Sequence, residues 1–180
     1  MSTSACTIRT IAALAVAVTA LTAPAPVGAS PDRDIQAQID AQLALDPTGV
    51  QISPDQVSYH NGTMTITFRS RTRSQSQAAV APQTLTPDCP SGSFCLYESV
   101  NYEGRRISYT TCTFRDLYPY YHDWADSIAF NKPSGYVNFI NHGKANHVGD
   151  TVLYTLSPAR RAVFDVKPYR NAIDHVDGAC

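Results

Sequence analysis

Residues 89–104 read CPSGSFCLYESVNYEG, a stretch that contains two cysteines, two tyrosines and a final glycine. Four residues separate Tyr97 from Tyr102, and Gly104 follows two positions later. Glycines, which tolerate the positive φ that other residues resist, recur at the expected turns of this part of the chain. Short β-rich runs continue to the C-terminus and predict an all-β sandwich: residues 94–97, 106–110, 127–130, 135–140, 151–155 and 162–166.

The pattern recurs once in the rest of the chain. Three residues of the first copy have counterparts at nearly constant offsets. The counterparts of Tyr97, Gly104 and Ser127 are Phe139, Gly149 and His175, at offsets of 42, 45 and 48 residues. This predicts two similar motifs, of which the second has gained a few residues.

The first copy resembles the Greek-key signature of βγ-crystallins, in which an aromatic pair folds over a hairpin. Tyr97, Tyr102 and Gly104 match that signature, and Ser127 resembles the serine whose hydroxyl ties the hairpin down. More narrowly, residues 89–106 resemble the secreted βγ-crystallin-like peptidase-inhibitor family, whose best-known members block thermolysin-type metalloproteases. The resemblance implies a two-motif Greek-key domain over residues 89–180.

For function, the resemblance implies stoichiometric binding to an extracellular protease, with a metalloprotease preferred and no enzyme activity. The alternative is a non-inhibitory βγ-crystallin-like structural or calcium-binding module. Characterised inhibitors of the family hold their reactive loop with a second pair of closely spaced cysteines, which this chain lacks. The inhibitory loop therefore stays unassigned, with residues 113–121 and 142–150 as candidates.

The N-terminus has the pattern of a secretory signal peptide. Arg9 is the only charged residue before Asp32, an apolar run covers residues 11–18, and small residues occupy 27–29. The apolar run is too short to span a bilayer. We therefore predict a signal peptide over residues 1–29 and a secreted chain with no membrane segment after cleavage.

Export places the cysteines in an oxidising compartment. Removal of Cys6 with the signal peptide leaves Cys89, Cys95, Cys112 and Cys180, which allow three pairings. A turn-forming Pro-Ser-Gly triplet lies between the first two, so the sequence favours a Cys89–Cys95 bond. Cys112 and Cys180 would then form the second disulfide. Zinc is the competing interpretation, but no Cys-x2-Cys pair occurs.

Charge points to no polyanionic partner. The chain has 14 basic and 15 acidic residues, and loss of Arg9 with the signal peptide would leave a formal net charge of −2. This balance does not suggest nucleic acid or an anionic membrane as a partner. We expect a monomer with one modest core.

Residues 30–68 have a helix-plus-hairpin pattern. Ile35, Ile39 and Leu43 lie four residues apart on one face of the expected helix. A hairpin with an Asn-Gly turn at residues 61–62 follows. Such a segment buries little on its own, so it either docks on its neighbour or serves as a pro-region.

Residues 69–88 have the composition of a flexible linker. Arg69, Arg71 and Arg73 alternate with serine and threonine, and glutamine, alanine and proline follow. The arginines are either part of a soluble tether or a processing site for a trypsin-like protease.

Calcium is a second implication of the resemblance. Microbial βγ-crystallins bind calcium through an Asn/Asp-Asn/Asp-x-x-Ser/Thr-Ser segment. In the first copy Asp123, Asp126 and Ser127 retain oxygen atoms for a weak site, although His122 replaces the first ligand. In the alternative, Asp126 and Ser127 only brace the hairpin. The second copy has lost the last serine to His175.

The histidines form no recognised catalytic motif. His142, His147 and His175 are a candidate metal cluster, but the sequence favours structural roles for them. An aromatic group at residues 118–121 and Trp124 suits either a recognition surface or the core. No cofactor is predicted apart from the calcium alternative.

Overall fold

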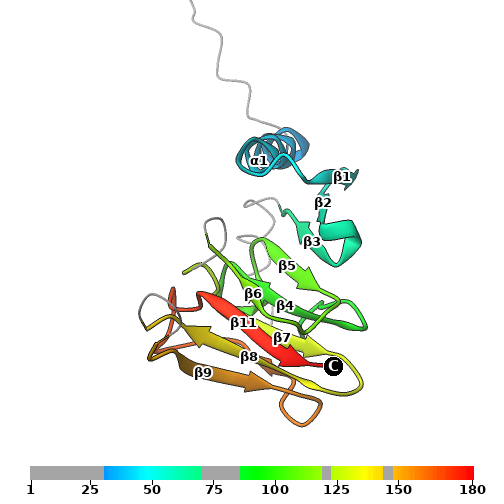
Figure 1. The fold of residues 1–180 in the computed structure, drawn as a ribbon. Helices are drawn as coiled ribbons and strands as arrows, with labels where there is room; N and C mark the ends of the chain where they lie inside the picture. Colours follow the sequence, from blue (N-terminus) through cyan, green and yellow to red (C-terminus); the bar gives the residue numbers. More distant parts are fainter. Residues whose placement is uncertain (1–30, 70–85, 119–122, 144–147) are drawn as a thin grey trace, which may run out of the picture.

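The computed structural model describes residues 31–69, 86–118, 123–143 and 148–180. Their secondary structure is mostly β, with one α-helix, α1 (Pro31–Leu45), ahead of the strands (Figure 1). The expected all-β class, with a small helix before the hairpins, is therefore confirmed. The predicted signal peptide and residues 70–85 of the predicted linker lie outside the described residues.

The strands form two antiparallel sheets. One sheet has seven strands in the order β1-β2-β3-β5-β4-β7-β10, and the other has four in the order β6-β11-β8-β9. The strand bounds are β1 (Val50–Ser53), β2 (Gln56–Tyr59), β3 (Met64–Thr67), β4 (Ser93–Tyr97), β5 (Arg106–Tyr109), β6 (Arg115–Asp116), β7 (Ser127–Asn131), β8 (Tyr136–Asn141), β9 (Thr151–Leu156), β10 (Ala162–Val163) and β11 (His175–Ala179).

Each Greek key gives its third strand to the opposite sheet. In the first motif β4, β5 and β7 lie in the seven-stranded sheet, whereas β6 pairs with β11 in the other. In the second motif β8, β9 and β11 lie in the four-stranded sheet, whereas β10 pairs with β7 in the other. Neither motif completes its sheet alone, so the two motifs depend on each other's third strand.

These third strands are where the predicted strand bounds are wrong. Only Ala162–Val163 of the expected strand at 162–166 pairs with β7. Beyond it the carbonyl of Phe164 accepts from the amide of Asn101, and the amide of Val166 donates to the carbonyl of Asp126. The backbone groups of Phe164 and Val166 therefore bond to residues outside the strands and not to a neighbouring strand. Strand β6 was not expected at all.

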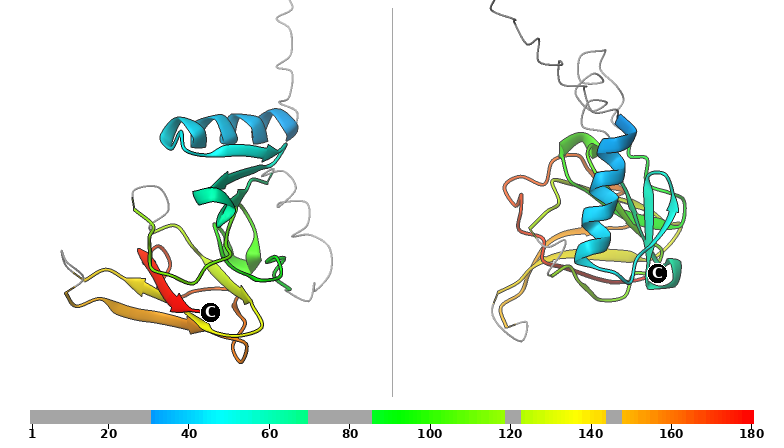
Figure 2. Two further views of the ribbon diagram at one scale, coloured as in Figure 1. Left: turned by 45° about the vertical axis from the view of Figure 1, so that its right-hand side comes forward. Right: turned by 90° about the horizontal axis from the view of Figure 1, so that it is seen from above.

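The helix packs on the sheet through the apolar face that the sequence predicted. Ile39 is fully buried, and Ile35 and Leu43 pack against the same core at its edge. Reciprocal side-chain hydrogen bonds of 3.2 and 3.1 Å between Gln36 and Gln51 join the helix to β1. Figure 2 shows α1 lying along β1 at one end of the molecule.

The N-terminal strands extend the sheet of the first Greek key. Strand β2 pairs with β3, and β3 pairs with β5, with Ile66 opposite both Val57 and Ile107. All three of these side chains are buried in one hydrophobic core. Residues 31–68 and the Greek-key domain therefore share one sheet and one core, which makes the segment a docked part of the domain.

The turn between β2 and β3 has the φ values that Asn-Gly favours. Asn61 and Gly62 have φ of 56° and 84°, and the amide of Thr63 donates to the carbonyl of His60 at 3.2 Å. His60 also has positive φ, at 51°. The connection between Tyr59 and Met64 is therefore four residues long, two more than the turn itself.

The core between the sheets is aromatic and aliphatic. Phe94 on β4 meets Phe139 on β8 edge to face, with ring centroids 6.1 Å apart. Both rings are fully buried. Full burial of such a side chain contributes about 1.5–3 kcal/mol, so contacts of this kind join the two motifs strongly.

Among the described residues, no helix has the length and apolar character needed to cross a membrane.

Candidate functional site

The first folded hairpin is held by its two tyrosines and a serine. The rings of Tyr97 and Tyr102 lie edge to face with centroids 5.4 Å apart. The amide of Tyr102 donates to Oγ of Ser127 at 3.1 Å, and this hydroxyl donates to the carbonyl of Ser99 at 2.6 Å. Gly104 has φ of 72°, a conformation that L side chains adopt only with strain. The four residues singled out from the sequence thus lie at one hairpin.

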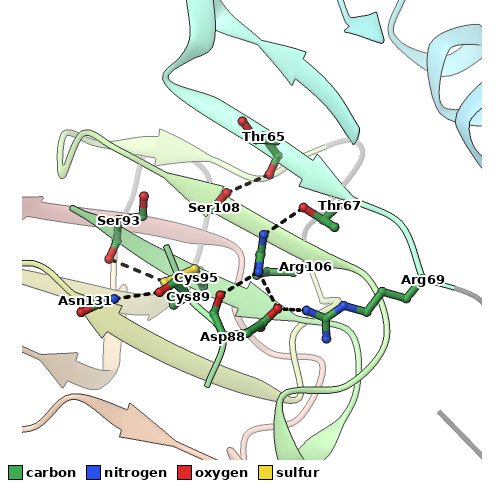
Figure 3. The surroundings of a disulfide bond; sticks show 10 residues. All are labelled: Thr65, Thr67, Arg69, Asp88, Cys89, Ser93, Cys95, Arg106, Ser108 and Asn131. Atoms are coloured by element: carbon green, nitrogen blue, oxygen red, sulfur yellow. Dashed lines mark hydrogen bonds and ion pairs between the residues drawn. A yellow bond between two sulfur atoms is a disulfide. The ribbon is translucent and has the colours of Figure 1, made fainter. Parts of the chain in front are cut away.

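The two disulfides join the pairs that the sequence favoured. Cys89 is bonded to Cys95 across the turn, with a Cα–Cα distance of 5.8 Å. Cys112 is bonded to Cys180, with a Cα–Cα distance of 5.7 Å, and this bond fixes the C-terminus. Next to the first disulfide, the side chain of Asn131 donates to the carbonyl of Cys89 at 2.8 Å (Figure 3).

Asp88 is the centre of a charged cluster beside that disulfide. Its carboxylate accepts from Arg106 at 2.6 Å and pairs with Arg69, and Arg106 also donates to Oγ1 of Thr67 at 3.0 Å (Figure 3). Burial raises the pKa of the neighbouring Tyr97 phenol well above its usual value, and the charge of Asp88 adds to the shift. Sequence reasoning placed Arg69 and Asp88 in the linker, whereas the structure makes them part of the domain.

The second folded hairpin uses different side chains. His175 begins β11, as Ser127 begins β7, and its Nε2 lies 3.1 Å from Oδ2 of Asp150. His142 packs its ring against that of His175, with centroids 5.5 Å apart. His142 and His175 of the predicted cluster are therefore together, while His147 lies outside the described residues. Asp150 was missed because no local spacing links it to His175.

The residues of the weak calcium alternative are next to the first hairpin. Both hydrogen-bonding functions of the Ser127 hydroxyl are used by that hairpin. Burial raises the pKa of the Asp126 carboxyl, although the positive charge of Arg170 acts in the opposite direction. Asp123 has φ of 54°, and its amide donates to the carbonyl of Ile173 at 3.1 Å. This geometry favours bracing of the hairpin by Ser127 over use of its hydroxyl as a calcium ligand.

The first candidate inhibitory loop, residues 113–121, leaves the domain from a fixed base. The amide of Leu117 donates to the carbonyl of Asp174 at 2.9 Å, and the side chain of Leu117 is buried. Phe114 and Tyr118 are 46% and 69% exposed, and residues 119–121 lie outside the described residues. The described part therefore presents aromatic side chains on an anchored backbone.

The second candidate loop, residues 142–150, connects β8 to β9. Oδ1 of Asp150 accepts from the amide of Gly143 at 3.0 Å, which ties the two ends of the loop together. Val148, two residues before Asp150, is exposed. Phe114 of the first loop reaches the same neighbourhood, because its ring centroid lies 5.3 Å from that of His175.

The aromatic group splits between surface and interior. Tyr118 is exposed, whereas Trp124 is partly buried against the core, with the guanidinium of Arg105 5.1 Å from its ring centroid. Tyr120 and Tyr121 lie outside the described residues. The recognition-surface interpretation therefore applies to Tyr118 and the core interpretation to Trp124.

Residues 82–139 match peptidase inhibitor family I36. This match confirms the family that the motif residues predicted. It covers the first Greek key and the start of the second, about a third of the chain. Over this segment the chain is therefore related to a family of non-enzymatic peptidase inhibitors, which supports a general role as a peptidase inhibitor.

The chain is also similar to a solved structure described as "Evolution of the eye lens beta-gamma-crystallin domain fold". The two are 18% identical with a TM-score of 0.39, and the match covers 52% of this chain and 92% of the other. No curated protein matches the chain.

Proposed function

We propose that this protein is a secreted inhibitor that binds an extracellular metalloprotease stoichiometrically through the segment containing Phe114 and Tyr118. The protease class follows from the resemblance of residues 89–106 to inhibitors of thermolysin-type enzymes. The inhibitor family and two disulfides are consistent with an extracellular protein.

The observation that carries this proposal is the anchoring of the exposed segment. The Cys112–Cys180 disulfide fixes the chain just before it, and the Leu117 amide bonds to Asp174 within it. Where the chain returns, the amide of Asp123 bonds to the carbonyl of Ile173. Anchors on both sides reduce the conformational entropy lost on binding, and thus raise affinity.

These anchors offer a replacement for the missing cysteine pair. In the family, a close disulfide keeps the reactive loop rigid, so that the protease binds it without releasing it quickly as product. Here the backbone of residues 173–174 accepts from Leu117 within the segment and from Asp123 just after it. Aromatic side chains at its described part would enter an apolar subsite of the protease, where they bury large area with little entropy loss.

The test is a titration of a fixed concentration of a thermolysin-type protease with residues 30–180, with a subtilisin-type protease in parallel. We expect tight loss of activity at an equimolar ratio for the metalloprotease. Tyr118→Ala and Phe114→Ala should each raise the apparent inhibition constant at least about tenfold, the loss of an interface anchor.

Phe164→Ala is the matched control, because Phe164 is 55% exposed and follows β10 at the far edge of the other sheet. It should inhibit as the parent does. If neither protease is inhibited and the protein stays intact, the chain is instead a non-inhibitory crystallin-like module. If inhibition survives both aromatic substitutions, the binding segment lies elsewhere, with residues 142–150 next to be tested.

A further inference from the structure

Three metal-binding side chains converge at the second folded hairpin. His142 directly follows β8, Asp150 directly precedes β9, and His175 is the first residue of β11. Each of these residues offers one ligand atom, and the three atoms lie within 4.8 Å of one another. The elements that bring them together are the strands of one sheet, so their positions are set by the fold.

Further hydrogen bonds orient this group. Oδ1 of Asp150 accepts from the amide of Gly143, so Oδ2 is left to face Nε2 of His175 at 3.1 Å. The amide of His142 donates to the carboxylate of Asp174 at 2.5 Å. The bond from Gly143 orients the Asp150 carboxylate, as outer contacts commonly do in metal sites. The bond to Asp174 fixes the backbone from which the His142 side chain extends.

The surroundings suit a cation. Asp150 and His175 line a hollow of about 410 Å³ together with Phe114, Ile140 and Asp177. Among these described lining residues there is no lysine or arginine, and Asp174 adds another carboxylate beside His142. His175 is 3% exposed and Asp150 is partly buried, whereas His142 is at the surface. An ion could therefore reach the group from the side of His142.

We propose that His142, Asp150 and His175 bind a divalent transition-metal ion, with zinc as the expected ion. The ion would join the second folded hairpin to β11, the task that the Ser127 hydroxyl performs in the first motif. This proposal does not depend on the inhibitory function.

The donor set selects the class of metal. Two imidazoles and one carboxylate suit zinc and its transition-metal neighbours, whereas calcium and magnesium prefer oxygen ligands only. Ligands bound at about 2.0–2.2 Å around a tetrahedral zinc lie roughly 3.3 Å apart. The His175–Asp150 pair is already at 3.1 Å, so chiefly the exposed His142 has to move. Three protein ligands would leave a position for water.

The test uses residues 30–180 stripped of metal with EDTA and then titrated with zinc chloride by calorimetry. We expect one equivalent to bind and the melting temperature to rise with zinc concentration. Calcium chloride at the same concentration should give a smaller rise. Cobalt(II) should give a visible absorption spectrum of a tetrahedral site with nitrogen and oxygen ligands.

His142→Asn removes one ligand and the exposed ring contact with His175 but preserves the His175–Asp150 contact, so its melting temperature in EDTA should lie close to that of the parent. Its zinc affinity should fall at least about tenfold, as should that of Asp150→Asn, whose remaining oxygen can still accept from Gly143. His60→Asn is the matched control, because His60 is exposed and asparagine tolerates its φ of 51°. The proposal is overturned if zinc does not raise the melting temperature, or if His142→Asn binds zinc as tightly as the parent and His60→Asn do.

Discussion

Ser127 and His175 occupy corresponding positions, each as the first residue of the strand that closes its Greek key. The Ser127 hydroxyl bonds directly to the backbone of its hairpin, at Tyr102 and Ser99. His175 instead meets the side chain of Asp150 at the end of its hairpin. A hydroxyl donates and accepts at once, whereas a single imidazole nitrogen either donates or accepts. The two copies thus close the same fold with different chemistry.

Ser127→Ala should destabilise the protein by about 2 kcal/mol. The substitution leaves the buried amide of Tyr102 without its acceptor, and burying an unsatisfied donor costs about 1–3 kcal/mol. Urea denaturation followed by tyrosine fluorescence would measure the change in the free energy of unfolding. Ser157→Ala, which removes an exposed serine–backbone bond, should change stability by less than about 0.5 kcal/mol. Equal effects of the two substitutions would contradict a bracing role for Ser127.

The two disulfides should differ in their contributions to stability. The Cys112–Cys180 bond joins residues 68 apart, and the Cys89–Cys95 bond joins residues 6 apart. In the chain-entropy description, the first restricts the unfolded chain by about 4 kcal/mol and the second by about 2 kcal/mol. Replacement of each pair by serine, followed by urea denaturation, would compare them. A larger loss on removal of Cys89–Cys95 would show that local packing, and not loop closure, sets the order.

The features that could be predicted from the sequence are local. Tyr97, Tyr102 and Gly104 match the βγ-crystallin hairpin signature that the sequence resembles, and the Pro-Ser-Gly turn brings Cys89 close to Cys95. Both signals lie within a few residues, where the chain geometry leaves few alternatives. The helix stripe of residues 35–43 is another periodic signal of this kind.

The features that were missed depend on long-range contacts. Strands β6 and β10 have two residues each, too few for a period of two to be detected. The pairing of β3 with β5 joins residues about 40 positions apart, across a segment with the composition of a linker. Asp150 meets His175 because β9 of the second hairpin and β11 belong to the same sheet, so no motif within the chain indicates their contact.

Asp126→Asn should stabilise the protein at pH 7 and have little effect at pH 3. Burial raises the pKa of the Asp126 carboxyl above its usual value, so the folded protein holds the proton more tightly than the unfolded chain. The folded state is therefore penalised as pH rises through the pKa of the folded protein, and a neutral asparagine avoids this penalty. Thermal melts of the parent and Asp126→Asn at both pH values measure this difference in stability. Asp40→Asn, on the exposed face of α1, is the control for charge removal.

The same variant tests the calcium alternative. A calcium ion held by Asp126 would favour the ionised carboxylate, so calcium chloride would raise the melting temperature of the parent and not that of Asp126→Asn. The hydrogen bonds of Ser127 lead us to expect no difference between them. A calcium-dependent rise seen only in the parent would instead assign the ion to this loop.

Cleavage between residues 70 and 85 should leave the two parts of the chain associated. Strand β3 pairs with β5 at four positions, and its Ile66 is buried against Ile107. Asp88 lies on the C-terminal side of the cut. It pairs with Arg69 on the N-terminal side and with Arg106 on its own side. These contacts do not depend on a continuous chain, so residues 31–68 should remain part of the folded protein after processing.

An engineered protease site between residues 76 and 77 makes the experiment direct. After cutting, size-exclusion chromatography should give one native peak that separates into two chains in denaturant. Arg106→Gln should lower the melting temperature of the cut protein more than Arg161→Gln, an exposed arginine, because Arg106 holds both Asp88 and Thr67. Release of residues 31–68 from a folded remainder would instead identify the segment as a pro-region. The strength of the β3–β5 contact, and not the composition of the intervening chain, therefore determines whether this segment belongs to the mature inhibitor.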